Sequence, residues 1–158
     1  MIVKEIRDED FTSYKKPSMV IGFPSCTFKC ERECGCRGMC QNTTLATAPD
    51  INISFDKIVD RYLSNPITKA IIMAGLEPLD SWDDLRELIT QFRLKTTDDL
   101  ILYTGYNKEE IQDMVDWLGQ FANIIIKFGR FIPNQQPHYD EVLGVKLASD
   151  NQSAERIS

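Results

Sequence analysis

Short apolar runs alternate with segments of mixed polarity along this chain. Four of the runs are rich in β-branched or aromatic residues, which predicts buried strands. They span residues 18–23, 70–74, 100–104 and 124–128, and a fifth strand is indicated more weakly at residues 142–147.

The segments between these strands carry apolar residues at three- and four-residue spacing, which predicts amphipathic helices. The first helix is expected to follow Ser54, a favourable N-cap residue, and to stop at Asn65-Pro66. The second is expected to begin at Ser81, because Ser81 and Asp84 resemble a capping box.

A third helix is predicted after Asn107, which is followed three residues later by Glu110, and this helix should end near Gly119. Strands that alternate with helices imply right-handed βαβ crossovers and a mainly parallel sheet. We therefore expect one α/β domain over residues 1–158. The loops after the first three strands should meet at one edge of the sheet and form a single pocket.

The composition indicates a globular protein and argues against two classes of binding partner. Hydrophobic residues make up 42% of the chain and charged residues 27%, which is the balance of a folded domain. The formal net charge of -6 argues against nucleic acid or an anionic membrane as the main partner. No apolar run of about 18 residues occurs, so we expect no membrane span. The absence of a signal-peptide pattern and the clustered cysteines predict a cytoplasmic location.

All five cysteines fall within one loop, at residues 24–42: Cys26, Cys30, Cys34, Cys36 and Cys40. Thiolates this close in sequence can surround one inorganic centre such as an iron–sulfur cluster. A structural zinc site usually uses cysteine pairs separated by two residues, and no such pair occurs here. Iron–sulfur is the favoured interpretation, with zinc and buried or redox-active thiols as alternatives.

Several motifs, taken in order and spacing, point to a family. Cys26 and Cys30 are separated by three residues and follow an apolar strand; the remaining motifs are Cys40-Gln41-Asn42, Ala74-Gly75-Leu76-Glu77-Pro78-Leu79, Tyr103-Thr104-Gly105-Tyr106 with Glu109-Glu110-Ile111, Gly129-Arg130-Phe131, and Ser149-Asp150-Asn151-Gln152. With these motifs the chain resembles, along nearly its whole length, the activating proteins of anaerobic ribonucleoside-triphosphate reductase. These are radical S-adenosylmethionine (SAM) enzymes.

The resemblance implies a fold, cofactors and a reaction. The fold would be a small, partial (β/α) barrel with a mainly parallel sheet, of the radical SAM type. The cofactors would be a 4Fe-4S cluster held by three thiolates and SAM, which is cleaved by one electron to give a 5′-deoxyadenosyl radical. This radical would remove hydrogen from a glycine of a large partner, the anaerobic ribonucleotide reductase. A flavodoxin- or ferredoxin-like protein would supply the electron.

The third cluster ligand is open, because the family spaces its cysteines as C-x3-C-x2-C and Glu33 stands at the third position. If Asn42 is aligned with the Asn of the family's Cys-aromatic-Asn motif, Cys40 becomes the third ligand and the residues between Cys30 and Cys40 become an insertion. Such an insertion is tolerated because the entropic cost of closing a loop grows only slowly with its length. Cys34 is the alternative, being closer to the usual spacing. Cys36 is the least favoured ligand.

The resemblance also implies SAM contacts. Gly75-Leu76-Glu77-Pro78 corresponds to the Gly-Gly-Glu-Pro segment whose backbone binds the SAM amino group, although Leu76 replaces a glycine that would allow close approach. Thr104 and Gly105 precede a helix, where backbone N–H groups can meet a carboxylate or hydroxyl. The alternatives are ordinary strand-to-helix turns, with Glu77 a solvated carboxylate.

Residues 129–158 are the candidate docking region for the partner, since a small activase needs a surface for a large enzyme. His138, the only histidine, is expected to have a surface or packing role. Two other functions stay open. One is activation of a different glycyl-radical enzyme, and the other is a non-enzymatic module in which a metal braces a protein-binding loop.

Overall fold

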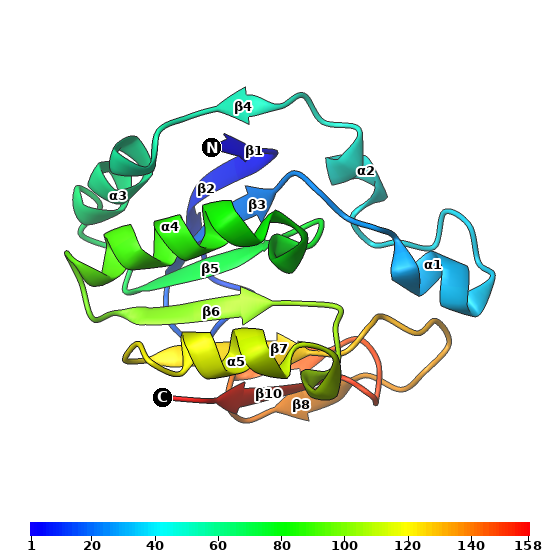
Figure 1. The fold of residues 1–158 in the computed structure, drawn as a ribbon. Helices are drawn as coiled ribbons and strands as arrows, with labels where there is room; N and C mark the ends of the chain where they lie inside the picture. The colour runs from blue at the N-terminus through cyan, green and yellow to red at the C-terminus, as the bar shows by residue number, and fades with distance from the viewer.

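A six-stranded sheet forms the centre of the computed structural model, which describes residues 1–158 (Figure 1). Its four inner strands are parallel and lie side by side: β3 (Ser18–Phe23), β5 (Ala70–Gly75), β6 (Asp99–Tyr103) and β7 (Ile124–Phe128). The strands predicted from the apolar runs are confirmed to within one residue at each end. All six residues of β3 and all five of β7 are buried, as expected for strands covered on both faces.

The two edge strands are antiparallel to their neighbours and were not predicted. β2 (Glu5–Asp10) pairs with β3, and β10 (Ser153–Arg156) pairs with β7. Both are polar and partly exposed, so they lack the apolar run that identifies an inner strand. The strand order is β10-β7-β6-β5-β3-β2, and the sheet is open, with β2 and β10 at opposite edges.

Three helices pack on one face of the sheet (Figure 1). They are α3 (Phe55–Leu63), α4 (Trp82–Arg93) and α5 (Gln112–Leu118). Their apolar sides join alternate residues of the inner strands in a cluster of 22 buried residues that includes Leu88, Phe92 and Met73. Burial of a side chain of this size contributes about 1.5–3 kcal/mol, so this layer carries much of the stability.

Of the three N-caps predicted for the helices, the structure has side-chain capping at only one. The side chains of Ser54 and Ser81 make no cap hydrogen bond, so the capping box expected at Ser81 is wrong. A short 3-10 helix, η1 (Pro78–Ser81), precedes α4 instead. The capping box between Asn107 and Glu110 is present and begins another 3-10 helix, η2 (Lys108–Glu110), which leads into α5.

The opposite face of the sheet is covered by a hairpin of β8 (His138–Asp140) and β9 (Val145–Leu147). Leu143 and Leu147 pack there with inner-strand residues such as Ile72. The strand expected at residues 142–147 therefore begins three residues later, after the turn of this hairpin. β1 (Ile2–Val3) and β4 (Ile51–Asn52) form a separate two-stranded sheet. No helix is long and apolar enough to cross a membrane.

The cysteine loop lies at the carboxyl ends of the parallel strands, beyond the arrowhead of β3 in Figure 1. It contains the short helix α1 (Lys29–Cys34), and a second short helix, α2 (Thr43–Ala46), follows it; neither was predicted. They have no buried residues, which explains why no apolar periodicity marks them. The loop stands against the edge where the other strand-to-helix loops end.

Candidate metal centre

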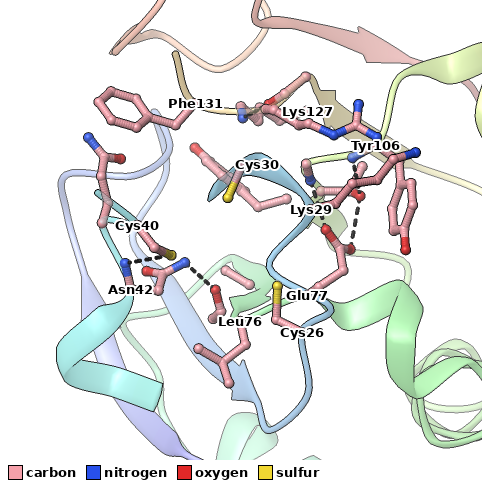
Figure 2. Close-up of a pocket in the computed structure, with 18 of the residues that line it drawn as sticks. Cys26, Lys29, Cys30, Cys40, Asn42, Leu76, Glu77, Tyr106, Lys127 and Phe131 are labelled. Atoms are coloured by element: carbon pink, nitrogen blue, oxygen red, sulfur yellow. Dashed lines mark hydrogen bonds between the residues drawn. The ribbon is translucent and has the colours of Figure 1, made fainter. Parts of the chain in front are cut away.

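One pocket opens at the carboxyl edge of the sheet, and the loops after β3, β5, β6 and β7 line it (Figure 2). The convergence of the first three loops, expected from the βα repeat, is confirmed. The lining residues that the argument uses are Cys26, Cys30, Cys40, Asn42, Gly75, Leu76, Glu77, Thr104, Gly105, Tyr106, Lys127, Gly129 and Arg130. Residues as distant in sequence as Cys26 and Gln152 thus share one small space.

The five cysteines divide into two groups. Cys26, Cys30 and Cys40 are half-buried and line the pocket, and Figure 2 shows their sulfur atoms directed toward the same open space. Cys34 is exposed, and neither it nor Cys36 lines the pocket. The Sγ of Cys36 donates to the carbonyl of Cys34 at 3.1 Å. No three acidic, histidine or cysteine side chains are close enough together to hold a single metal ion.

Two of the pocket thiols receive backbone hydrogen bonds. The N–H of Phe28 donates to Cys26 Sγ at 3.2 Å, and the N–H of Asn42 donates to Cys40 Sγ at 3.4 Å. Phe28 reaches this position with φ of 51°, a left-handed conformation uncommon for a bulky residue. Such N–H groups stabilise a sulfur that carries negative charge.

The chemistry of these donors fits a cluster of iron and sulfide. Burial raises the pKa of Cys26 to about 11 and also raises the pKa of Cys30, so these thiols lose their protons readily only when a cation binds to the sulfur. Soft thiolates favour iron–sulfur clusters and zinc over hard cations. Three thiols on one pocket are the number that a 4Fe-4S cluster with one open iron requires.

Asn42 ties the cysteine loop to the segment after β5. Its side-chain N–H donates to the carbonyl of Gly75. Gly75 has φ of 101°, and a Cβ atom there would lie 2.6 Å from the backbone nitrogen of Phe23. The two strands therefore approach so closely that only glycine fits at this position.

The backbone at position 76 accommodates a leucine without strain, although the sequence suggested that a glycine was needed there. Between residues 75 and 78 only Gly75 has a positive φ, so Leu76 needs no left-handed conformation. The N–H of Leu76 donates to the carbonyl of Phe23 at 3.3 Å, and the N–H of Glu77 donates to Ser25 at 2.8 Å. The carbonyl of Leu76 accepts no hydrogen bond within the chain, and Leu76 is one of the residues that line the pocket.

Glu77 is buried and links two loops through hydrogen bonds. The alternative interpretation, that Glu77 is a solvated carboxylate, is therefore wrong. Only 5% of the residue is exposed. Its carboxylate accepts hydrogen bonds from the N–H of Leu79 at 3.2 Å, the hydroxyl of Thr104 at 2.9 Å and the N–H of Gly105 at 2.8 Å. Pro78, by contrast, begins η1 and is buried without lining the pocket.

The pKa of Glu77 makes stability depend on pH. Burial raises this pKa from 4.5 to about 7 despite the three hydrogen bonds, so the folded state holds the proton more tightly than the unfolded state. The contribution of Glu77 to the free energy of unfolding should therefore fall by about 3 kcal/mol as the pH rises from 4.5 to 7. Urea unfolding at several pH values should show the wild type losing stability relative to Glu77→Gln across this range.

A matched control for this prediction is Glu141→Gln, because Glu141 is exposed and forms no side-chain hydrogen bond. Its difference from the wild type should stay nearly constant over the same range. A constant difference for Glu77→Gln as well would show that the buried carboxyl does not retain its proton.

An ion-pair network, which the sequence did not predict, anchors α1 over the pocket. Glu110 accepts two hydrogen bonds from Arg130, at 2.8 and 2.6 Å, and one from Lys29 at 2.5 Å. The Arg130 guanidinium is the main reason that the pKa of Glu110 falls to about 2. Arg130 also lies 3.1 Å from Glu33, which stands where the resemblance described above would have put a third cysteine. Glu33 therefore helps to hold the loop in place.

Two further residues shape the pocket without having been predicted. Asp80 accepts hydrogen bonds from the N–H of Thr27 at 2.8 Å and from the hydroxyl of Tyr106 at 2.7 Å, which joins the cysteine loop to the loop after β6. Lys127 is buried in β7 and lines the pocket. A charged residue inside an otherwise apolar strand was the available signal for Lys127.

The fold and these thiols together define an α/β protein with a cluster-binding site at the carboxyl edge of its sheet. The chain matches the family described as "4Fe-4S single cluster domain" over residues 19–153, and it belongs to this family. The match supports the iron–sulfur interpretation of the cysteine loop, with a 4Fe-4S cluster as cofactor, over the zinc alternative. No curated protein and no solved structure matches the chain.

Proposed function

We propose that the protein is a radical SAM activase that generates the glycyl radical of anaerobic ribonucleoside-triphosphate reductase. One observation carries the proposal. The cysteine loop, the Gly75 segment and the Thr104 segment, each matched to a family motif by the sequence, border a single pocket. The bond from Asn42 to Gly75 joins the first two directly.

The proposed ligands of the 4Fe-4S cluster are Cys26, Cys30 and Cys40. Cys34 remains the alternative third ligand, disfavoured because it is exposed and outside the pocket lining. When bound, the cluster supplies one-electron reduction of SAM. The electron would come from a flavodoxin- or ferredoxin-like donor. The N–H groups of Phe28 and Asn42 hold two of the thiolates in position.

The remaining residues of the pocket orient SAM in this proposal. The carbonyl of Leu76, which has no partner within the chain, would accept a hydrogen bond from the amino group of SAM. Thr104 and Gly105 are held by Glu77, so their role is to fix the loop rather than to donate to SAM through the groups already bonded. Tyr106 offers an aromatic face, which Arg130 also approaches, at the wall of the pocket.

The proposed docking surface for the reductase is the exposed part of residues 129–158. Ile132 and Tyr139 are exposed there, at 38% and 56%, and Phe131 reaches the pocket itself. Other parts of the region belong to the fold and to the pocket: β10 pairs with β7 in the central sheet, and Gln152 is one of the residues that line the pocket. Removing everything after Phe128 would thus damage the sheet, so single substitutions at Ile132 and Tyr139 are the sharper test.

If the proposed function is correct, the protein should form two products from SAM and one radical on its partner. Protein purified and reconstituted with iron and sulfide without oxygen should be brown, and should convert SAM to 5′-deoxyadenosine and methionine when dithionite is added. Mixed with an anaerobic ribonucleotide reductase, it should give a glycyl radical by electron paramagnetic resonance. A brown protein that forms neither product would contradict the enzymatic proposal, and a colourless protein with stoichiometric zinc would contradict the cluster. Radical formation only on another glycyl-radical enzyme would reassign the partner.

A further inference from the structure

The ammonium group of Lys127 is a buried cation with unused hydrogen-bonding capacity. Only 7% of the residue is exposed. Its Nζ can donate three hydrogen bonds, yet its one partner is the carbonyl of Gly129 at 2.8 Å. Burying a charge without a counter-ion costs several kcal/mol, so such a group is normally paired or serves to bind a ligand.

No residue of the chain neutralises Lys127 directly. Glu77 is close enough to raise its pKa, but the two do not form an ion pair, and both oxygens of Glu77 are taken by Leu79, Thr104 and Gly105. Glu110 is held by Arg130 and Lys29 and forms no ion pair with Lys127 either. Burial lowers the pKa of Lys127 to about 8, which still leaves most of it charged at pH 7.

The position of Lys127 limits what its partner can be. Lys127 and Leu76 border the same pocket, and Leu76 presents a free carbonyl. The pocket therefore offers a cation donor and a neutral acceptor, which complement the carboxylate and ammonium of an α-amino acid. An exposed acidic side chain of a partner protein could not easily reach a nitrogen buried to this extent.

We propose that Lys127 binds the carboxylate of the methionyl part of SAM and so selects ligands that retain this group. The inference rests on the proposed function, since it names which part of SAM the lysine contacts. It makes Lys127 a specificity-determining residue in the pocket. The Gly129 carbonyl does not depend on Lys127 alone, because the side-chain amide of Gln152 also donates to it, at 3.3 Å.

Calorimetric binding of SAM and of decarboxylated SAM to the reconstituted protein at pH 7 tests this assignment. The wild type should bind SAM about 10- to 100-fold more tightly than the decarboxylated compound, the range expected for a charge-assisted hydrogen bond. Lys127→Met should lose most of this preference by weakening SAM binding while leaving the decarboxylated compound within about threefold. The control Lys146→Met, at an exposed position in β9, should bind both as the wild type does.

The possible outcomes separate the two proposals. If the wild type binds SAM but shows no preference over decarboxylated SAM, or if Lys127→Met weakens both equally, the assignment of Lys127 is wrong and the function stands. If the wild type binds neither compound, the function itself fails. The thermal midpoint of Lys127→Met without SAM should equal or exceed that of the wild type, because an unpaired buried charge is removed. If Lys127→Met does not fold, the same comparison is made with Lys127→Gln, which keeps a hydrogen-bond donor and removes the charge; an unchanged preference for SAM in Lys127→Gln would also overturn the assignment.

Discussion

Replacement of Cys40 by serine is expected to abolish the 4Fe-4S cluster, whereas replacement of Cys34 should leave it in place. Cys40 lines the pocket with Cys26 and Cys30, and its sulfur accepts the N–H of Asn42. Cys34 lies one helical turn beyond Cys30, exposed, outside the pocket lining. A cluster with two thiolates is not held, so the expected result is loss of nearly all iron and sulfide from Cys40→Ser.

Iron and sulfide per chain after anaerobic reconstitution, together with the visible absorbance of the cluster, measure this directly. Cys36→Ser is the matched control, since Cys36 also lies in the loop but does not line the pocket. Full cluster retention in Cys40→Ser, with loss in Cys34→Ser, would transfer the third ligand to Cys34. It would also require α1 to turn, because Glu33 of this helix is paired with Arg130.

The choice between Cys40 and Cys34 shows where sequence spacing stops being informative. Spacing alone puts Cys34 nearer to Cys30, but distance along the chain is not distance in the fold. The intervening residues form α1 and a turn at Gly35, and this path returns Cys40 to the pocket. The N–H of Cys40 donates to the carboxylate of Glu31 at 3.0 Å, which helps to close the path. The loop has no apolar periodicity, so the sequence favoured Cys40 through the Asn that follows it and not through any predicted path of the chain.

The inner sheet was predictable because apolar strands covered on both faces have an unmistakable composition. β2 and β10 were not, since edge strands can be polar and short. Glu77 shows the same limit within the pocket. Its partners Thr104 and Gly105 are 27 and 28 residues away, and only the parallel pairing of β5 with β6 brings the loops together. A motif located the carboxylate, but its burial and bonding depend on the tertiary fold.

Gly75→Ala is expected to destabilise the protein by about 3–5 kcal/mol, the largest single-residue effect on stability that we predict. Two costs add at this position. The φ of 101° is unfavourable for any residue with a Cβ atom, and that atom would lie 2.6 Å from the nitrogen of Phe23 and 2.7 Å from the Cα of Gly22. Both contacts are with backbone, which cannot rotate away as a side chain would. Urea unfolding provides the measurement.

Gly35→Ala separates these costs, because Gly35 also has a left-handed φ, 65°, but no atom lies within 4 Å of its added Cβ. It should lose only the conformational part, about 1–2 kcal/mol. Equal losses for the two variants would mean that the close approach of β3 and β5 does not contribute. If Gly75→Ala costs more than Gly35→Ala, the geometry of the site also depends on the close approach of β3 and β5. Phe23 and Gly75 end these two strands, and Cys26 and Glu77 follow them in the pocket. A wider gap between the strands would therefore move a thiol and a buried carboxylate apart.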